Sequence, residues 1–180
     1  MTPLPLSCAM PVLAMAVVAA ASAQTVTPIH PGQAGSPHVR YEREVEGVHV
    51  SIEYGRPRLK GRAFADLAPA GRIWRTGADE ATTFRASRAL VLGPHVLEAG
   101  HYSLYTIPGP REWMLVVNAD HGQWGTVYDA ARDVLRVPMT VRSGQAMTEE
   151  LTISIERAAT GHELRIVWGD VQAAVSISAR

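Results

Sequence analysis

The chain has 180 residues, enough for one domain with a hydrophobic core, and its 17 basic residues balance 17 acidic ones. This zero net charge argues against a nucleic-acid partner, because proteins that bind nucleic acids usually carry a basic surplus. The single cysteine, Cys8, excludes a disulfide within the chain and a structural zinc site of the cysteine type.

Residues 1–23 are predicted to be a secretory signal peptide. No charged residue occurs from Leu4 to Ala23, and an apolar run ends in the small-x-small pattern Ala21-Ser22-Ala23. The run is too short and too rich in alanine for a transmembrane helix. We therefore expect an exported protein, periplasmic or extracellular, with no stable membrane insertion after the signal is removed.

Residues 24–40 hold several prolines, glycines and a serine, and they offer little that could build a core. We expect a flexible lead-in here. Residues 41–180 are expected to form a single domain.

The folded region is dominated by a period of two, which indicates strands. Apolar and polar residues alternate strictly over 48–54, so one face of that strand should lie in the core and the other in solvent. Three closing runs, near 151–155, 164–168 and 171–177, alternate in the same way and predict an antiparallel meander.

About eight or nine short strands and no long helix predict an all-β protein, either a sandwich or a barrel. We favour an antiparallel β-sandwich, because the strands are short and several prolines stand at their ends. One short helical turn is expected near 63–67, where Pro69 and Gly71 would end it.

The densest cluster of charged, aromatic and small residues spans 74–82, with the sequence WRTGADEAT. One interpretation is a structural latch, in which Trp74 buries its ring, Gly77 supplies an unusual backbone geometry and Thr82 opens the next strand. The other interpretation is a binding site at a strand edge.

Four charged residues are candidates for ligand binding: Arg56, Arg75, Asp79 and Glu80. An arginine can hold a carboxylate or phosphate with two parallel hydrogen bonds, whereas nearby carboxylates can instead pair with it structurally. In an extended strand Asp79 and Glu80 would point to opposite faces, which makes them a poor acid–base pair of the glycosidase type.

Trp124 lies in a predicted loop and is the best candidate for an exposed platform that stacks on sugar rings, with Trp113 and Tyr105 as weaker ones. Such aromatics can also plug the end of a core. No two histidines have the i, i+2 or i, i+4 spacing that brings metal ligands together, so no metal site and no cofactor are predicted. A serine-hydrolase elbow and a phosphate-binding glycine loop are also absent from the sequence.

Several motifs resemble the DUF2911 family, which comprises exported bacterial proteins whose domain has no assigned function. The block at 74–82 is the most specific of them, and where the family pattern has Asn this chain has Asp79. The resemblance implies export and a compact domain, and it implies no reaction. The motifs that carry it are Tyr54-Gly55-Arg56-Pro57, Gly61-Arg62, the block at 74–82, Gly100-x-Tyr102-Ser103-Leu104 and Gln123-Trp124-Gly125.

Three functions remain open from the sequence. The first is a non-catalytic domain that binds a small anion or a glycan through Arg56, Arg75 and Trp124. The second is a hydrolase that uses Glu80 or Asp79 as a general base. The third is a purely structural domain in which the segment 74–82 only joins strands, and the oligomeric state is open in all three.

Overall fold

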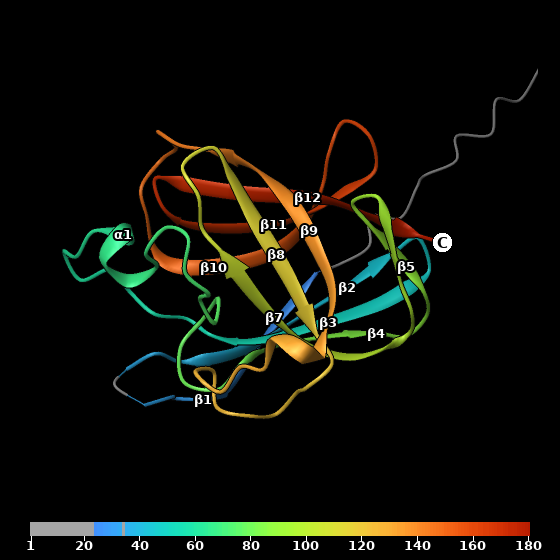
Figure 1. The fold of residues 1–180 in the computed structure, drawn as a ribbon, viewed down its shortest axis with the longest axis horizontal. Helices are drawn as coiled ribbons and strands as arrows, with labels where there is room; N and C mark the ends of the chain where they lie inside the picture. Colours follow the sequence, from blue (N-terminus) through green and yellow to red (C-terminus); the bar gives the residue numbers. More distant parts are fainter. Residues whose placement is uncertain (1–23, 34) are drawn as a thin grey trace, which may run out of the picture.

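The computed structural model describes residues 24–33 and 35–180, so the predicted signal peptide lies outside the described residues. Twelve antiparallel strands of this region form one sheet (Figure 1), which confirms the all-β class. The strands are β1 (Thr25–His30), β2 (His38–Val45), β3 (Val48–Gly55), β4 (Thr82–Ala86), β5 (Leu90–Leu92), β6 (His95–Leu97), β7 (Gly100–Ile107), β8 (Glu112–Asn118), β9 (Asp133–Arg142), β10 (Thr148–Arg157), β11 (His162–Gly169) and β12 (Val171–Ala179).

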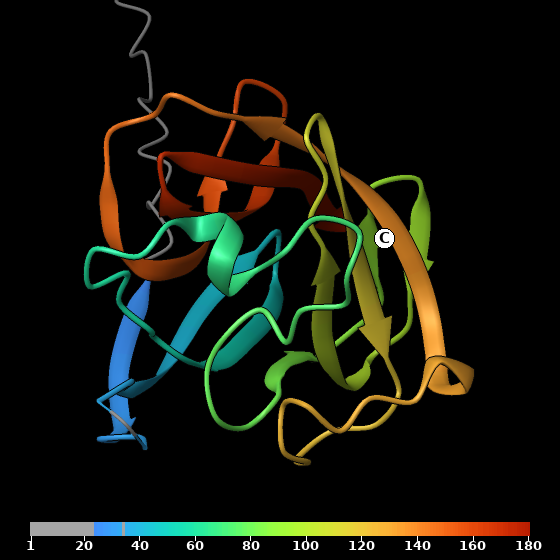
Figure 2. The same cartoon turned by 60° about the vertical axis from the view of Figure 1, so that its left-hand side comes forward.

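The sheet runs in the order β1-β2-β3-β4-β7-β8-β9-β12-β11-β10, with β5 pairing to β12 and to β6. It curls into a half-barrel, so that β2 and β3 come to face β10 across the core (Figure 2). The structure therefore differs from the predicted sandwich of eight or nine strands. Alternation in the sequence tells which face of a strand is buried, but a curled sheet and two stacked sheets bury that face equally well.

Two tyrosine hydroxyls bind the backbone of the edge strand β10. The hydroxyl of Tyr41 donates to the carbonyl of Ile155 at 2.8 Å and accepts from its N–H at 2.9 Å. The hydroxyl of Tyr54 donates to the carbonyl of Ile153 at 3.4 Å and accepts from its N–H at 3.0 Å. Burial raises the pKa of both phenols, so both remain protonated. These bonds satisfy edge groups that would otherwise be unpaired in the core.

The predicted helical turn is α1 (Phe64–Leu67), which lies at one end of the curled sheet (Figures 1 and 2). Phe64 stacks on Trp113 with ring centroids 5.3 Å apart, and Trp74 stacks on Trp168 at 5.7 Å. This aromatic cluster closes that end of the core and fixes the start of the segment 74–82. No helix among the described residues has the length and apolar character needed to cross a membrane.

A flexible lead-in was expected over residues 24–40, but the structure forms β1 and the start of β2 in this range. Backbone pairing holds the two strands in register, with His30 opposite His38. All six side chains of β1 are exposed, so this strand leaves no pattern of burial in the sequence. The hairpin matters for function because it brings residues 30–38 against the segment 74–82.

Candidate functional site

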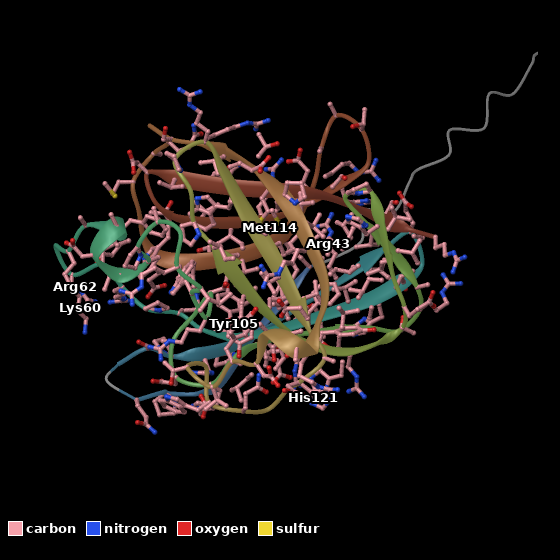
Figure 3. All side chains as sticks on the ribbon, viewed as in Figure 1. Arg43, Lys60, Arg62, Tyr105, Met114 and His121 are labelled. Carbon is pink, nitrogen blue, oxygen red and sulfur yellow. The ribbon has the colours of Figure 1, made fainter. Side chains whose placement is uncertain are left out.

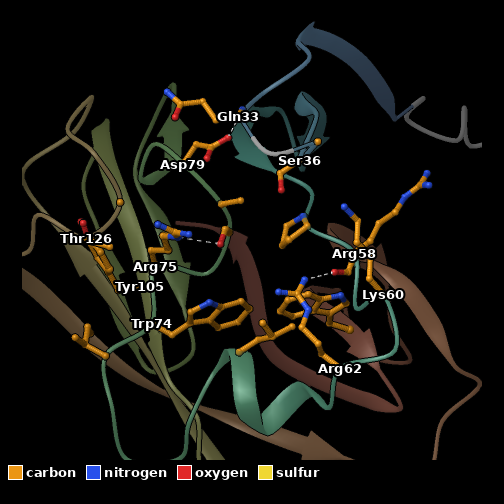
Figure 4. A pocket seen from close by; sticks show the side chains of 18 of the residues that line it. Gln33, Ser36, Arg58, Lys60, Arg62, Trp74, Arg75, Asp79, Tyr105 and Thr126 are labelled. Carbon is orange, nitrogen blue, oxygen red and sulfur yellow. Dashed lines mark hydrogen bonds between the residues drawn. The ribbon is translucent and has the colours of Figure 1, made fainter.

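A cavity of about 690 Å³ opens beside the segment 74–82, at the α1 end of the molecule (Figure 4). Its lining comes from the turn before β2, the stretch between β3 and β4, and the loop between β8 and β9. Strands β7 and β11 each add one aromatic residue, Tyr105 and Trp168. The cavity therefore depends on contacts between distant parts of the chain.

The inner part of the cavity is apolar and aromatic. Trp74 is labelled in Figure 4, and Trp168 stacks on it with nearly parallel rings. Leu67 and Ile73 extend this surface. Such a surface suits a flat or apolar part of a ligand.

The remaining lining is strongly basic: four basic residues and one acidic residue, Asp79, contribute to it. Arg58 pairs with Glu150, whose Oε1 lies 2.6 Å from Arg58 Nε and whose other oxygen contacts Arg56. The other three are Lys60, Arg62 and Arg75, and among the described residues none of their side-chain cations forms a salt bridge. The backbone N–H of Lys60, however, donates to Glu149 Oε1 at 2.7 Å, which places one carboxylate beside this set. The cavity thus has more basic than acidic side chains in its lining, and three of the cations form no salt bridge within the described chain.

Arg75 is the half-buried member of this basic set. Its Nε donates to the carbonyl of Gly77 at 3.3 Å, and its remaining donors have no partner among the described residues. Lys60 and Arg62 are exposed and lie beside α1 (Figure 3). The guanidinium of Arg62 donates to the carbonyls of Leu59 and Arg58, both at 2.9 Å, which directs it along the cavity rim.

The segment 74–82 is held firmly at both ends. Trp74 and Thr106 exchange two backbone hydrogen bonds, at 2.7 and 2.9 Å. Near the other end, Ala81 donates to the carbonyl of Gln123 at 3.0 Å, and Thr82 opens β4 as predicted. The segment therefore joins strands, as the latch interpretation expects, and it also lines a cavity, as the site interpretation expects.

Position 77 requires glycine because there is no room for a side chain, and not because of its backbone angle. A Cβ at this position would lie 2.7 Å from the Oγ1 of Thr82, closer than real side chains approach. The left-handed backbone angles of the segment belong instead to Thr76 and Asp79, with φ of 54° and 61°. The prediction that Gly77 supplies the unusual geometry was wrong in this respect.

The left-handed turn at Asp79 also changes where the two acids point. The prediction for an extended strand placed Asp79 and Glu80 on opposite faces, but both carboxylates approach Nε2 of His38, at 3.5 and 3.2 Å. Asp79 Oδ2 also accepts a hydrogen bond from the backbone N–H of Gln33 at 2.7 Å. The expected ion pair with Arg75 is not formed, because the carboxylates face the β1–β2 hairpin.

Of the predicted site residues, Arg75 and Asp79 line the cavity, and three others do not. Arg56 pairs with Glu150 at 3.2 Å and donates to a backbone carbonyl, so it belongs to a structural ion pair. Glu80 faces His38 outside the cavity. Trp124 is 38% exposed next to the lining residue Gly125, whereas the other predicted platform residues, Trp113 and Tyr105, are buried.

The sequence did not predict the contribution of Lys60, Arg62 and Tyr128 to the cavity, whereas Tyr105 was named only as a weaker platform candidate. The pair of cations around Gly61 was a usable signal, because three basic residues occur between positions 58 and 62 with no acid among them. Burial raises the pKa of Tyr105 and of Tyr128, so the hydroxyls of both stay protonated. Tyr105 is held by Val127 and Gln123, at 2.9 and 3.0 Å.

Comparison with known proteins yields one match. A family model described as "Protein of unknown function (DUF2911)" matches residues 36–177, which confirms the resemblance seen in the motifs. Neither the curated proteins nor the solved structures gave a match.

Proposed function

The chain belongs to the DUF2911 family, whose description assigns no function, and we propose from the cavity that this protein binds a small organic anion. The ligand carries a carboxylate or phosphate group and an apolar or aromatic part. The volume of about 690 Å³ supports this, since it falls within the range of small-molecule sites.

The observation that carries the proposal is that Arg75 lines the cavity and forms no salt bridge within the described chain. This half-buried guanidinium faces the cavity without a carboxylate partner among the described residues. A partly desolvated cation is stabilised by an anion that it can bind with two hydrogen bonds. Lys60 and Arg62 add positive charge at the rim, which would attract the same anion from solution.

The aromatic surface supports the second half of the proposed ligand. Trp74 and Trp168 line the cavity near Arg75 and are rigidly packed, with 8% and 2% of their surfaces exposed, so the apolar part of a ligand would contact only the small part of each ring that the cavity reaches. A neutral glycan is a second candidate, supported by the exposure of Trp124. It has weaker support, because this ring lies outside the cavity lining.

A hydrolase has less support than a binding protein. Asp79 is the one acid among the described lining residues, and its Oδ2 already accepts a hydrogen bond from the backbone N–H of Gln33. Glu80 lies outside the lining and faces the same histidine. The cavity therefore holds one carboxylate, which the hairpin already binds, and no second one to share acid–base catalysis.

The proposed binding domain would act outside the cytoplasm, in the periplasm or the extracellular space. This part of the proposal is supported by the apolar run before Gln24 and its small-x-small end. Expression of the full chain in a bacterium, followed by cell fractionation and amino-terminal sequencing, tests it. The expected result is an exported protein that begins at Gln24, and an uncleaved cytoplasmic chain would contradict it.

Calorimetric titration with phenyl phosphate tests the binding proposal, because this probe combines a ring with a dianion. Inorganic phosphate has the charge without the ring, and phenol has the ring without the charge. We expect phenyl phosphate to bind more tightly than either. Equal binding of phenol and phenyl phosphate would overturn the role of the basic residues, and binding of glucose alone would favour the glycan.

A further inference from the structure

We infer that His30, His38 and Glu80 form a binding site for a divalent transition-metal ion of the zinc class. Each residue offers one ligand atom, and the three atoms lie within 4.8 Å of one another. The site goes beyond the proposed anion binding, because none of the three residues lines the cavity. The sequence predicted no metal site, since it placed both histidines in a flexible lead-in.

The hairpin of β1 and β2 brings the two histidines together. His30 and His38 are opposite each other in the register of the two strands, and their ring centroids are 4.2 Å apart. Eight residues separate them in the sequence, so spacing alone gives no sign of this contact. Adjacent imidazoles that are held by a hairpin are a common basis for binding zinc, copper or nickel.

The turn at Asp79 supplies the carboxylate. It directs Glu80 Oε2 to 3.2 Å from His38 Nε2. Two ligands of a tetrahedral zinc ion, each bonded at about 2.0–2.1 Å, lie roughly 3.3 Å apart, so the spacing already fits the edge of a coordination tetrahedron. Asp79 Oδ2 lies 3.5 Å from the same nitrogen and adds negative charge beside the site.

Two atoms of this cluster are buried without a hydrogen-bond partner among the described residues. They are Nε2 of His38 and Oε2 of Glu80. Buried polar atoms almost always have a partner, so two unsatisfied atoms only 3.2 Å apart call for one. A shared cation would satisfy both atoms at once.

His30 completes the set from the exposed side. Its Nδ1 accepts a hydrogen bond from the backbone of Gly32 at 3.1 Å, in an exposed contact. Coordination of a metal through this ring exchanges that contact for a metal bond. Two histidines and one glutamate leave a fourth position for water, which is the ligand set that zinc ions use when they keep an open position.

The test is calorimetric titration of the purified protein, free of any histidine tag and treated with a chelator, with ZnCl₂ in a phosphate-free buffer. We expect one Zn²⁺ per chain, and we expect Mg²⁺ not to compete because it prefers oxygen ligands. The variants His30→Ala and Glu80→Gln should each weaken binding by more than about tenfold, since even outer-shell changes cost that much. Both are chosen because neither side chain is fully buried.

The control is His121→Ala. His121 stacks on His101 with ring centroids 4.0 Å apart, but these two histidines belong to no cluster of three ligands among the described residues. This variant should bind Zn²⁺ like the parent. No Zn²⁺ binding by the parent, or binding that His30→Ala and Glu80→Gln both retain, would overturn the site. The titration contains no organic anion, so its result is independent of the anion proposal.

Discussion

Nε2 of His38 lies 3.2 Å from Oε2 of Glu80, and this contact joins the amino-terminal hairpin to the segment 74–82. The backbone of Gln33 binds Asp79 at 2.7 Å beside it. Gln33, Gly35 and Ser36, which line the cavity, therefore belong to the candidate site rather than to a tether in front of the domain. The family model matches from residue 36, so it includes His38 but not the strand that carries His30.

Asp79 should be replaceable by Asn but not by Ala. Its φ of 61° is left-handed, a conformation that Asp and Asn adopt more readily than Ala. We expect Asp79→Ala to lower the free energy of unfolding by about 1–2 kcal/mol, as expected for a left-handed residue, and Asp79→Asn to change it less. Urea unfolding measures both, and equal losses would contradict the backbone argument.

The tyrosine hydroxyls that bind β10 should matter for stability. Tyr41→Phe leaves the buried N–H and carbonyl of Ile155 without their partner, which should cost about 1–3 kcal/mol. Tyr102→Phe is the matched control, because that hydroxyl donates to the carbonyl of Glu98 in an exposed contact. Similar losses in the two variants would show that the hydroxyl of Tyr41 does not help to close the curled sheet.

Stability should fall as the pH drops, in part because of His162. Burial lowers its pKa, the charges of Arg43 and Arg157 lower it further, and Glu46 opposes them. The unfolded chain then binds more protons than the folded one below the usual histidine pKa of about 6.5, so the free energy of unfolding decreases from about pH 7 to pH 5. In His162→Gln this decrease should be smaller.

Urea unfolding at the two pH values measures this effect. His95→Gln is the control, because His95 is exposed and the substitution is again histidine to glutamine. It should retain the full decrease. If His162→Gln loses as much stability as the parent on acidification, another group controls the pH dependence.

Most strands were predictable because their burial follows a period of two. The run at 48–54 became β3, and the three closing runs became β10, β11 and β12, paired as a meander. β1 was missed because its side chains are all exposed and its pairing is made by the backbone. The curl of the sheet was missed because it depends on contacts such as Tyr41 with Ile155, which are 114 residues apart.

The candidate site was predictable in part. The density of charge at 74–82 singled out Arg75 and Asp79, and both line the cavity. Lys60 and Arg62 reach the same cavity from a separate irregular stretch. No local pattern in the sequence links that stretch to the segment 74–82. The direction of Glu80 was mispredicted because one left-handed residue before it turns the chain, and a periodic pattern cannot show such a turn.

The most direct test of the account compares Arg75→Ala with Arg88→Ala, by thermal unfolding and by titration with phenyl phosphate. Both arginines donate to a backbone carbonyl, at 3.3 and 2.9 Å, and neither pairs with a carboxylate of the described chain, but only Arg75 lines the cavity. Anion binding through Arg75 predicts near-parental melting for both variants and loss of phenyl phosphate binding in Arg75→Ala alone. A much lower melting temperature for Arg75→Ala, with phenyl phosphate binding intact, would contradict it and make Arg75 a structural residue.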